Sequence, residues 1–453
     1  MIDARQWLML IPILLILVSV SSGKSADGIA RNPTKDRLDS LTLEQCLTLA
    51  LDGNPDLKLA ALGVQSAASQ RREIAGQRLP AIGLVAGYSV YSENQRLVPA
   101  GVPNDPGAFG GTIFSGDVNL GMPLFTWGKI TSEIGFASLQ VKASEWRLER
   151  VRQEVIFQVS ATFNEILAQA RRVDAALIAK TSLKDHLKRV QELIQAGKAA
   201  RVDLLKLQVR LAELEQRIIR EDDALRRQKL LLANLMGLKV EPDSFAITGR
   251  LDTTVHTDEY YWNPDTAFYL RPDYQALQTL RDAQQRKLKS AQAVRLPGVS
   301  AYAAGGTRWM PEPDITQSGA EEQEWTAKGG IVLTMPLFQG GQVSARIQQQ
   351  KIVLQEVEEN LNKLRLQIRL EVESARINLN AAQARFAAGK AAVGQADETY
   401  RIEQEKYLLG KGTTADLLDA QAARLEAETN YYSALSDIKT ASAGLRLALG
   451  VNQ

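Results

Sequence analysis

The chain has 453 residues, of which 54 are Lys or Arg and 52 are Asp or Glu. Because these charges nearly cancel, nothing in the net charge indicates a nucleic-acid partner. Aromatic residues make up only 6 % of the chain, whereas Ala, Leu, Gln, Glu and Arg crowd its long segments. This composition is expected of extended helices rather than of a thick globular core.

The first 26 residues have the pattern of a secretory signal peptide. Arg5 precedes an apolar run from Trp7 to Val20, which is followed by the small residues Ser21, Ser22 and Gly23. The run is too short for a confident membrane span, and a retained N-terminal anchor is the alternative. A polar linker is expected at 27–39. No later stretch approaches the ~18 apolar residues of a membrane-spanning helix, so a crossing of the membrane would have to use strands.

Two copies of one long element make up most of the remaining chain. Met122-Pro123-Leu124-Phe125 returns as Met335-Pro336-Leu337-Phe338, and Gly197-Lys198 returns as Gly410-Lys411, both 213 positions later. Asn54-Pro55-Asp56 and Leu79-Pro80 return as Arg271-Pro272-Asp273 and Leu296-Pro297. An internal repeat decides the architecture before any other pattern does. We therefore expect repeat 1 at 40–238, an inter-repeat linker at 239–263 and repeat 2 at 264–453.

Apolar positions spaced by three and four predict helices in both repeats. They are expected at 41–79, 128–196 and 202–236, and again at 272–296, 341–409 and 414–449. The two longest run for nearly 70 residues without proline, which gives helices of roughly 100 Å with a coiled-coil seam. Thr42 and Gln45 form a capping-box pattern at the first helix, and Cys46, the only cysteine, is expected to be an inert packed thiol.

Four strands with alternating polarity are expected at 81–91, 113–124, 298–309 and 325–337. Pro80, Pro123, Pro297 and Pro336 mark the transitions between strands and helices, with Pro123 and Pro336 ending their strands. One face of each strand is apolar. This face would point inward in a soluble sandwich and toward lipid in an outer-membrane barrel. Because four strands cannot close a barrel and an open edge is not tolerated in lipid, the membrane interpretation requires several chains.

Catalytic constellations are lacking in the sequence. His186 lies in a polar helical pattern and His256 in the linker, without partners at ligand spacing, so both are expected to be solvated surface residues rather than metal ligands. There is no phosphate-binding loop, dinucleotide fingerprint or nucleophile elbow. We expect no enzyme activity and no cofactor.

The turn from Gly410 to Asp419 has two interpretations. For folding alone, Gly410 and Gly412 supply the turn, Thr413 or Thr414 caps the next helix, and the acids suit its dipole. Asp203, after Gly197, admits the same explanation. The functional interpretation is that symmetry multiplies Asp416 and Asp419 into rings at a constriction, where carboxylates favour cations.

Together these features resemble the TolC family of outer-membrane efflux proteins. The resemblance spans about residues 40–450 and rests on the duplicated order of elements, the Met-Pro-Leu-Phe segments, and the turn from Tyr407-Leu408-Leu409-Gly410 to Asp416-Leu417-Leu418-Asp419-Ala420. It implies a homotrimer in which a barrel shared between protomers lies in outer-membrane lipid of a Gram-negative bacterium. A periplasmic tunnel of coiled-coil helices would continue the barrel, and its tip would meet a periplasmic adaptor (membrane fusion protein) and an inner-membrane pump.

The resemblance also implies roles for individual residues. Asp416 and Asp419 match two acidic rings, Tyr407 matches a gate tyrosine, and Asp203 matches the acid of the first-repeat turn. Gly412 departs from the pattern, since the best-known member has a gate arginine there, and Arg201 is the candidate replacement.

We therefore expect a passive exit duct whose tip opens like an iris at the Gly197 and Gly410 turns. The alternative is a soluble periplasmic coiled-coil adaptor or structural protein. It would need the strands to form a sandwich or lipoyl-like domain, and their symmetric placement between helices argues against this.

Overall fold

The computed structural model describes residues 38–99, 107–239, 241, 244–251, 264–311, 314–315 and 323–451. The chain divides into two units, Met1–Asp39 and Ser40–Gln453, and the account below concerns the second. The expected signal peptide, the linker as far as residue 37, and His256 lie outside the described residues.

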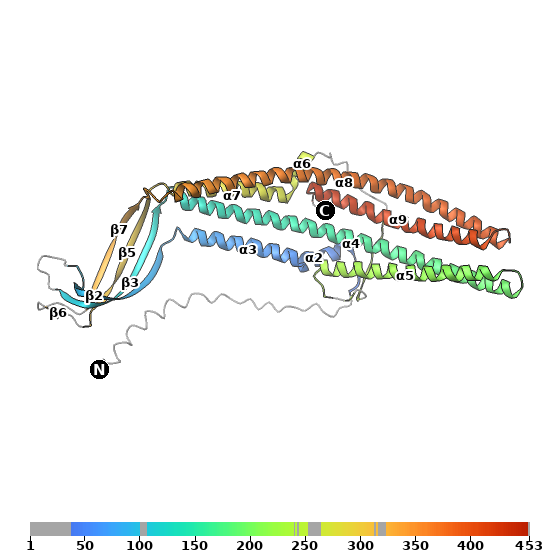
Figure 1. The fold of residues 1–453 in the computed structure, drawn as a ribbon, viewed down its shortest axis with the longest axis horizontal. Coiled ribbons are helices and arrows are strands. Elements are labelled where there is room, and N and C mark those ends of the chain that lie inside the picture. Colours follow the sequence, from blue (N-terminus) through green and yellow to red (C-terminus); the bar gives the residue numbers. More distant parts are fainter. Residues whose placement is uncertain are drawn as a thin grey trace, which may run out of the picture. The chain divides into compact units, whose positions relative to one another are not determined.

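The long helices and strands follow the same order in both repeats (Figure 1). The first contains β1 (Leu38–Leu41), α2 (Leu43–Gly53), α3 (Pro55–Gly76), β2 (Ala81–Arg96), β3 (Ala108–Phe125), α4 (Lys129–Gln195) and α5 (Arg201–Leu235). Strand β4 (Phe245–Ile247) lies within the expected inter-repeat linker. The second repeat contains α6 (Pro264–Leu270), α7 (Pro272–Ala293), β5 (Gly298–Trp309), β6 (Asp314–Ile315), β7 (Gln323–Thr334), α8 (Gln342–Leu408) and α9 (Thr414–Leu449). The sequence patterns did not predict α6, β1, β4 or β6.

Local capping explains where several helices begin. Thr42 and Gln45 form the expected capping box at α2, so the first helix begins after Leu41 rather than at it. The Asn54 side chain accepts hydrogen bonds from the backbone N–H groups of Asp56 and Leu57 and thereby separates α2 from α3. Gly128 and Gly341 precede the two long helices with φ of 77° and 82°, a left-handed conformation that favours glycine.

The four long strands form one antiparallel sheet in the order β2-β3-β5-β7. The register pairs Leu84 with Val118 and Tyr88 with Phe114 on one face. Asp117 lies opposite Gly306 on the other. On the apolar face, the rings of Tyr88, Phe114 and Trp309 follow one another at centroid distances of 4.9 and 5.0 Å. The strands thus present the two chemically different faces that their alternation predicted.

No layer of the described residues covers the apolar face of the sheet. Ile82, Leu84 and Ile331 are 72 %, 68 % and 70 % exposed. A soluble sandwich would bury these side chains in its own core. The fold therefore does not support the sandwich that the adaptor alternative requires.

Pro123 does not end β3, contrary to the sequence-based expectation. The strand continues to Phe125, with a register shift between Pro123 and Phe125 in its pairing with β5. Pairing with β2 already stops at Gly121, so the missing N–H of Pro123 lies where β3 has a neighbour on one side only. Pro80 and Pro297 immediately precede β2 and β5, and Pro336 lies two residues after β7.

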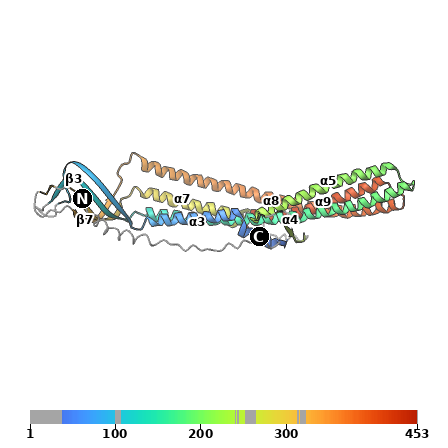
Figure 2. The same cartoon turned by 90° about the horizontal axis from the view of Figure 1, so that it is seen from below.

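The two repeats share one helical core. Helix α4 packs against α3 and α5 of its own repeat and against α7 and α9 of the other, while α8 packs against α7 and α9 (Figures 1 and 2). One apolar cluster joins Leu183 of α4, Leu207 of α5 and Leu418 of α9. The long helices are therefore held by both repeats. None of the helices in the described part of the chain is both long and apolar enough to span a membrane.

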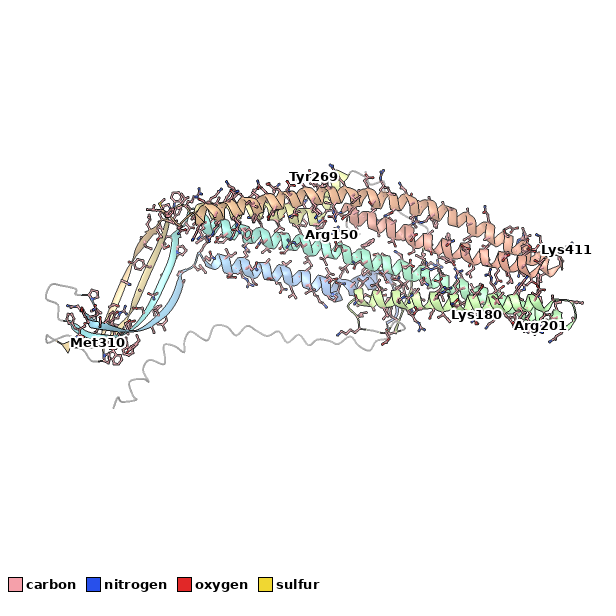
Figure 3. All side chains as sticks on the ribbon, in the orientation of Figure 1. Arg150, Lys180, Arg201, Tyr269, Met310 and Lys411 are labelled. Carbon is pink, nitrogen blue, oxygen red and sulfur yellow. The ribbon has the colours of Figure 1, made fainter. Side chains whose placement is uncertain are left out.

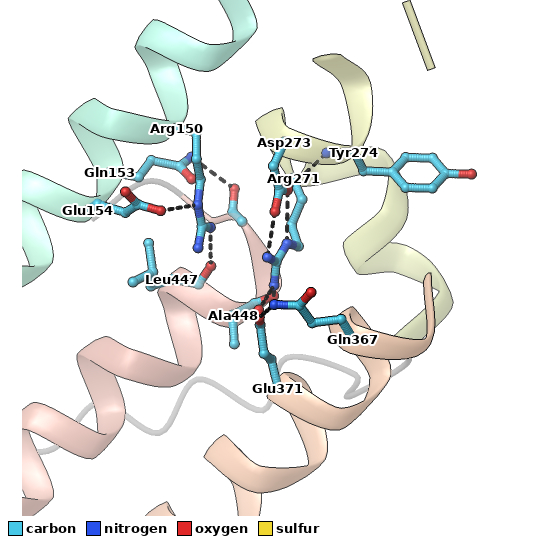
Figure 4. A network of polar contacts seen from close by, with 11 residues as sticks. Arg150, Gln153, Glu154, Arg271, Asp273, Tyr274, Gln367, Glu371, Leu447 and Ala448 are labelled. Carbon is cyan, nitrogen blue, oxygen red and sulfur yellow. Dashed lines mark hydrogen bonds and ion pairs between the residues drawn. The ribbon is translucent and has the colours of Figure 1, made fainter. Parts of the chain in front are cut away.

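A polar network joins the carboxyl end of α9 to the start of α7 (Figure 4). Arg271, only 1 % exposed, donates to Asp273 and Glu371, each at 2.6 Å, and to the carbonyl of Ala448 at 3.1 Å. Arg150 donates to the carbonyl of Leu447 at 3.2 Å. Arg271 gives a partner to the Ala448 carbonyl at the helix end, and Arg150 gives a second donor to the Leu447 carbonyl, which also accepts from the Gly450 N–H. Both positive charges suit the negative dipole end of α9.

Candidate functional site

The turns after the two long helices lie at the end of the helical layer away from the sheet (Figures 1 and 2). Gly197 and Gly410 both have φ of +67°. The N–H of the following lysine donates back into the helix, from Lys198 to the Leu193 carbonyl at 2.8 Å and from Lys411 to the Lys406 carbonyl at 2.9 Å. This is the Schellman motif, which requires a residue that adopts a left-handed conformation without strain. Both long helices therefore end in the same C-terminal capping motif.

Gly412 lies tightly against the end of α8. Its N–H donates to the Lys406 carbonyl at 3.1 Å, and a Cβ at this position would lie 3.1 Å from the Lys406 Cβ and the Tyr407 nitrogen. An arginine there would require these neighbours to shift slightly. Gly412, which replaces the expected gate arginine, therefore lies in a closely packed turn.

Asp416 is fixed by the first turn of α9. Its carboxylate accepts a hydrogen bond of 2.7 Å from the Thr413 hydroxyl, and its backbone N–H donates to the same hydroxyl at 3.2 Å. The Thr413 hydrogen bonds hold the pKa of Asp416 below its ordinary value, so this carboxylate is charged at neutral pH. Asp419 lies three residues later and is also exposed. The two carboxylates thus share a side of the helix.

The first-repeat tip has a different chemistry. Ala200 precedes α5 and provides no side-chain cap, and Asp203 lies half-buried in the first helical turn. Arg201 is exposed, and Figure 3 shows it at the end of one hairpin, with Lys411 at the end of the other. Both tips therefore present basic and acidic side chains within a few residues of each other.

The ring of Tyr407, the candidate gate tyrosine, meets the His186 ring at a centroid distance of 5.4 Å and an interplanar angle of 81°. Tyr407 also packs against the cluster of Tyr400, Leu417 and Ala420. The candidate gate tyrosine therefore joins α8 to α4 through a histidine.

His186 is the functional candidate that the sequence analysis missed. It is 7 % exposed, so the expectation of a solvated surface residue was wrong. Leu183 and Val190, three positions before and four positions after it, are buried on the same side of α4. That apolar spacing was the available signal, and the polar residues between these positions masked it.

The environment of His186 disfavours its charged form. Burial lowers the pKa of the imidazole below the ordinary value of 6.5, and the positive charge of Arg189 acts in the same direction, while Asp185 opposes them. His186 is therefore neutral at pH 7.

Two further hydrogen bonds join the hairpins near this contact. The hydroxyl oxygens of Ser182 and Tyr400 lie 3.0 Å apart, and Gln421 of α9 donates to the Ala179 carbonyl of α4 at 3.0 Å. In the ranges that the structure describes, no group of three or more His, Cys, Asp or Glu could hold a metal ion. As Cys46 is 0 % exposed and burial raises the pKa of its thiol to about 11, it has the character of the expected inert thiol.

Long helices that continue a four-stranded sheet also occur in solved outer-membrane channels. The solved structure of the CmeC outer membrane channel of Campylobacter jejuni has the same fold, with a TM-score of 0.75 and 20 % sequence identity over 90 % of this chain and 85 % of that one. The predicted fold class, mainly helical with a strand portion, is confirmed.

The chain belongs to the outer membrane efflux protein family, whose model matches residues 46–238 and 263–451. Among its relatives, the protein CyaE of Bordetella pertussis is 24 % identical over 92 % of this chain and 86 % of its own length. The alkaline protease secretion protein AprF of Pseudomonas aeruginosa is 26 % identical over 74 % of this chain and 69 % of its own length.

Family membership confirms the expected function and location. The protein is a passive duct in the outer membrane through which material leaves the Gram-negative cell. The family consists of channel proteins rather than enzymes, and the soluble adaptor alternative is not favoured.

Proposed function

We propose that three copies of this chain form one exit duct, with a shared barrel in the outer membrane and a helical tip that opens and closes. The observation that carries the proposal is the sheet of a single protomer. Among the described residues, its outer strands, β2 and β7, each have a neighbouring strand on one side only, and its apolar face is exposed. Unpaired strand edges are not tolerated in lipid. Pairing β7 of one copy with β2 of the next would remove every edge.

The first test is the protein mass of the particle extracted from outer membranes in mild detergent, corrected for bound detergent. We expect three mature chains per particle. In an eight-stranded barrel, side chains fill the interior, whereas a twelve-stranded barrel is wider and leaves an open lumen. Such a lumen suits a duct. A particle of one chain would contradict the shared barrel, because four strands leave open edges. A particle of two chains would contradict the duct, because side chains fill an eight-stranded barrel.

We further propose that Asp416 and Asp419 form the cation-selective constriction of the closed tip. Both are exposed, and the Thr413 cap favours the charged form of Asp416. In a three-fold assembly, each aspartate would become a ring around the axis. Closely spaced carboxylates attract cations, and divalent cations most strongly.

A double variant, Asp416→Asn with Asp419→Asn, tests this constriction in planar bilayers. The amide oxygen of asparagine at position 416 can still accept the hydrogen bond from the Thr413 hydroxyl, so the turn should fold while the charge disappears. We expect the preference for cations over anions to fall and the concentration of divalent cation needed to block conductance to rise at least about tenfold, the equivalent of ~1.4 kcal/mol in binding.

The matched control for the double variant is Glu426→Gln, which removes an exposed carboxylate further along α9. It should leave selectivity and block unchanged. If divalent cations block the double variant as they block the wild type, the aspartates do not form the constriction. The proposal that three chains form the duct would not be affected by this result.

The gating partners are part of the same proposal. The expected periplasmic adaptor and inner-membrane pump would engage the tip and supply the energy for opening. Tyr407, Asp203 and Arg201 would then act in opening, together with the turns at Gly197, Gly410 and Gly412. The Tyr407 contact with His186 supports a gate built from packing between the hairpins.

A further inference from the structure

The contact between His186 and Tyr407 joins two elements that must separate if the tip opens. His186 lies on α4 of the first hairpin and Tyr407 on α8 of the second. Ser182, one helical turn before His186, contacts Tyr400 on the same two helices. The contacts of Ser182 with Tyr400 and of His186 with Tyr407 therefore form a seam between the two hairpins of one protomer.

We propose that His186 is a proton-sensitive latch of the tip gate: in the neutral form it holds α4 against α8, and protonation releases this contact. The proposal rests on the tip gate proposed above. It adds the residue that senses the signal and identifies the signal as acidity at the periplasmic side.

The groups around His186 favour release on protonation. On α4 itself, Arg189 repels a positive imidazolium, and Asp185 compensates only in part. On α8, the uncharged Tyr407 contacts the ring, and the uncharged Gln404 lines the adjacent cavity of about 520 Å³. The residues of α5 and α9 in the surrounding apolar clusters include Leu204, Leu207, Leu417 and Leu418.

Burying a charge without a close counter-charge is unfavourable. Contact of an imidazolium with the Tyr407 ring would offset only part of that cost. The cavity beside His186, also lined by Ser182 and Asp185, offers a way for water to reach the ring once it becomes charged. Protonation should therefore move the imidazole toward solvent and away from Tyr407.

The direction of the pH effect follows from linkage. In the closed tip, the pKa of His186 lies below 6.5; when the seam opens and water reaches the ring, its pKa returns toward 6.5. Below that pH the open state binds more protons than the closed state, so acid favours opening. Each latch can shift the equilibrium by up to about tenfold per pH unit until the closed-state pKa is reached.

The experiment measures open probability in planar bilayers as the pH on the tip side falls from about 7.5 to about 5.5. We expect the wild type to open at least about tenfold more often at the lower pH. His186→Phe keeps an aromatic ring against Tyr407 but cannot bind a proton, so its opening should be rare and independent of pH. His186→Arg carries a permanent charge and should open at both pH values.

Two controls separate His186 from other titrating groups. His256→Gln removes the only other histidine and should respond to pH like the wild type. Glu428 also has its pKa raised by burial, but it is unchanged in every variant, so any response that it causes would persist in His186→Phe.

A direct titration does not depend on a folded His186 variant. In the His256→Gln protein, His186 is the sole histidine, and NMR of labelled imidazole should give a pKa below 6.5. A pKa at or above 6.5, or an unchanged pH response in His186→Phe, would overturn the latch while leaving the duct intact. Failure of the wild type to form pores at any pH would instead contradict the proposed duct.

Discussion

Replacing Arg271 by alanine should lower the free energy of unfolding by about 3 kcal/mol, the lower end of the cost of breaking a buried ion pair, because the two carboxylates left without their partner are partly exposed. The Arg271 side chain is 1 % exposed and forms ion pairs of 2.6 Å with Asp273 and with Glu371. Its removal also leaves the Ala448 carbonyl at the end of α9 without this donor. One substitution therefore affects α7, α8 and α9 together.

The measurement is chemical denaturation of the detergent-solubilised protein, followed by helical circular dichroism. The matched control is Arg281→Ala in the same helix α7, where Arg281 and its neighbour Asp282 are both partly exposed. Such a surface pair contributes at most about 1 kcal/mol. Equal effects of the two substitutions would show that the Arg271 network does not hold the helices together.

Acid should weaken this network only at low pH. Burial acts to raise the pKa of Asp273, but its hydrogen bonds and ion pair with Arg271 prevail and hold it below the ordinary 3.8. The stabilisation is therefore fully present above about pH 3.8 and is lost as the pH falls through the lower pKa of the folded protein.

Replacing Gly306 by alanine should strongly reduce assembly of the barrel. A Cβ on Gly306 would overlap the Gly116 carbonyl oxygen and the Asp117 carboxylate of the neighbouring strand. The Asp117 side chain crosses this position to reach Arg308 at 2.8 Å. Relief of the overlap would require β3 and β5 to separate or the ion pair to break, and forced shifts of this kind cost about 1–3 kcal/mol or more per site.

The adjacent glycine provides the control for Gly306. A Cβ on Gly305 would find its nearest neighbour, the Thr326 carbonyl oxygen, at 3.9 Å, which is ordinary van der Waals contact. We expect Gly305→Ala to assemble like the wild type, and Gly306→Ala to yield at least about tenfold less assembled protein in outer-membrane fractions, as ~1.4 kcal/mol would produce. Normal yield of Gly306→Ala would show that the two strands can move apart at this point.

Strand length shows where local patterns stop being informative. The sequence predicted strands at 81–91 and 113–124, whereas β2 and β3 extend to Arg96 and begin at Ala108. Their added residues pair across the hairpin, Gln95 with Gly110 and Arg96 with Phe109. Because this end has no regular apolar alternation, only the pairing itself reveals the strands.

The sequence by itself determined the duplicated plan, the long helices, the faces of the strands and the turns at Gly197 and Gly410. These features follow from periodicity and from contacts a few residues apart, such as the capping box of Thr413 and Asp416, so neighbouring positions carry their signal. The candidate acidic residues of the tips, Asp203, Asp416 and Asp419, could likewise be named from the sequences of the two turns. Their role in the duct stays a prediction.

Only the tertiary structure decided which distant groups meet. His186 meets Tyr407, Arg271 meets Glu371 and Asp117 meets Arg308, and the members of each pair lie in different helices or strands. Whether a histidine is solvated or a buried arginine is paired depends on the register of packed elements, which no local periodicity specifies. The latch and the helix junction are therefore properties of the packing between the two repeats, and the ion pair in the sheet is a property of strand register.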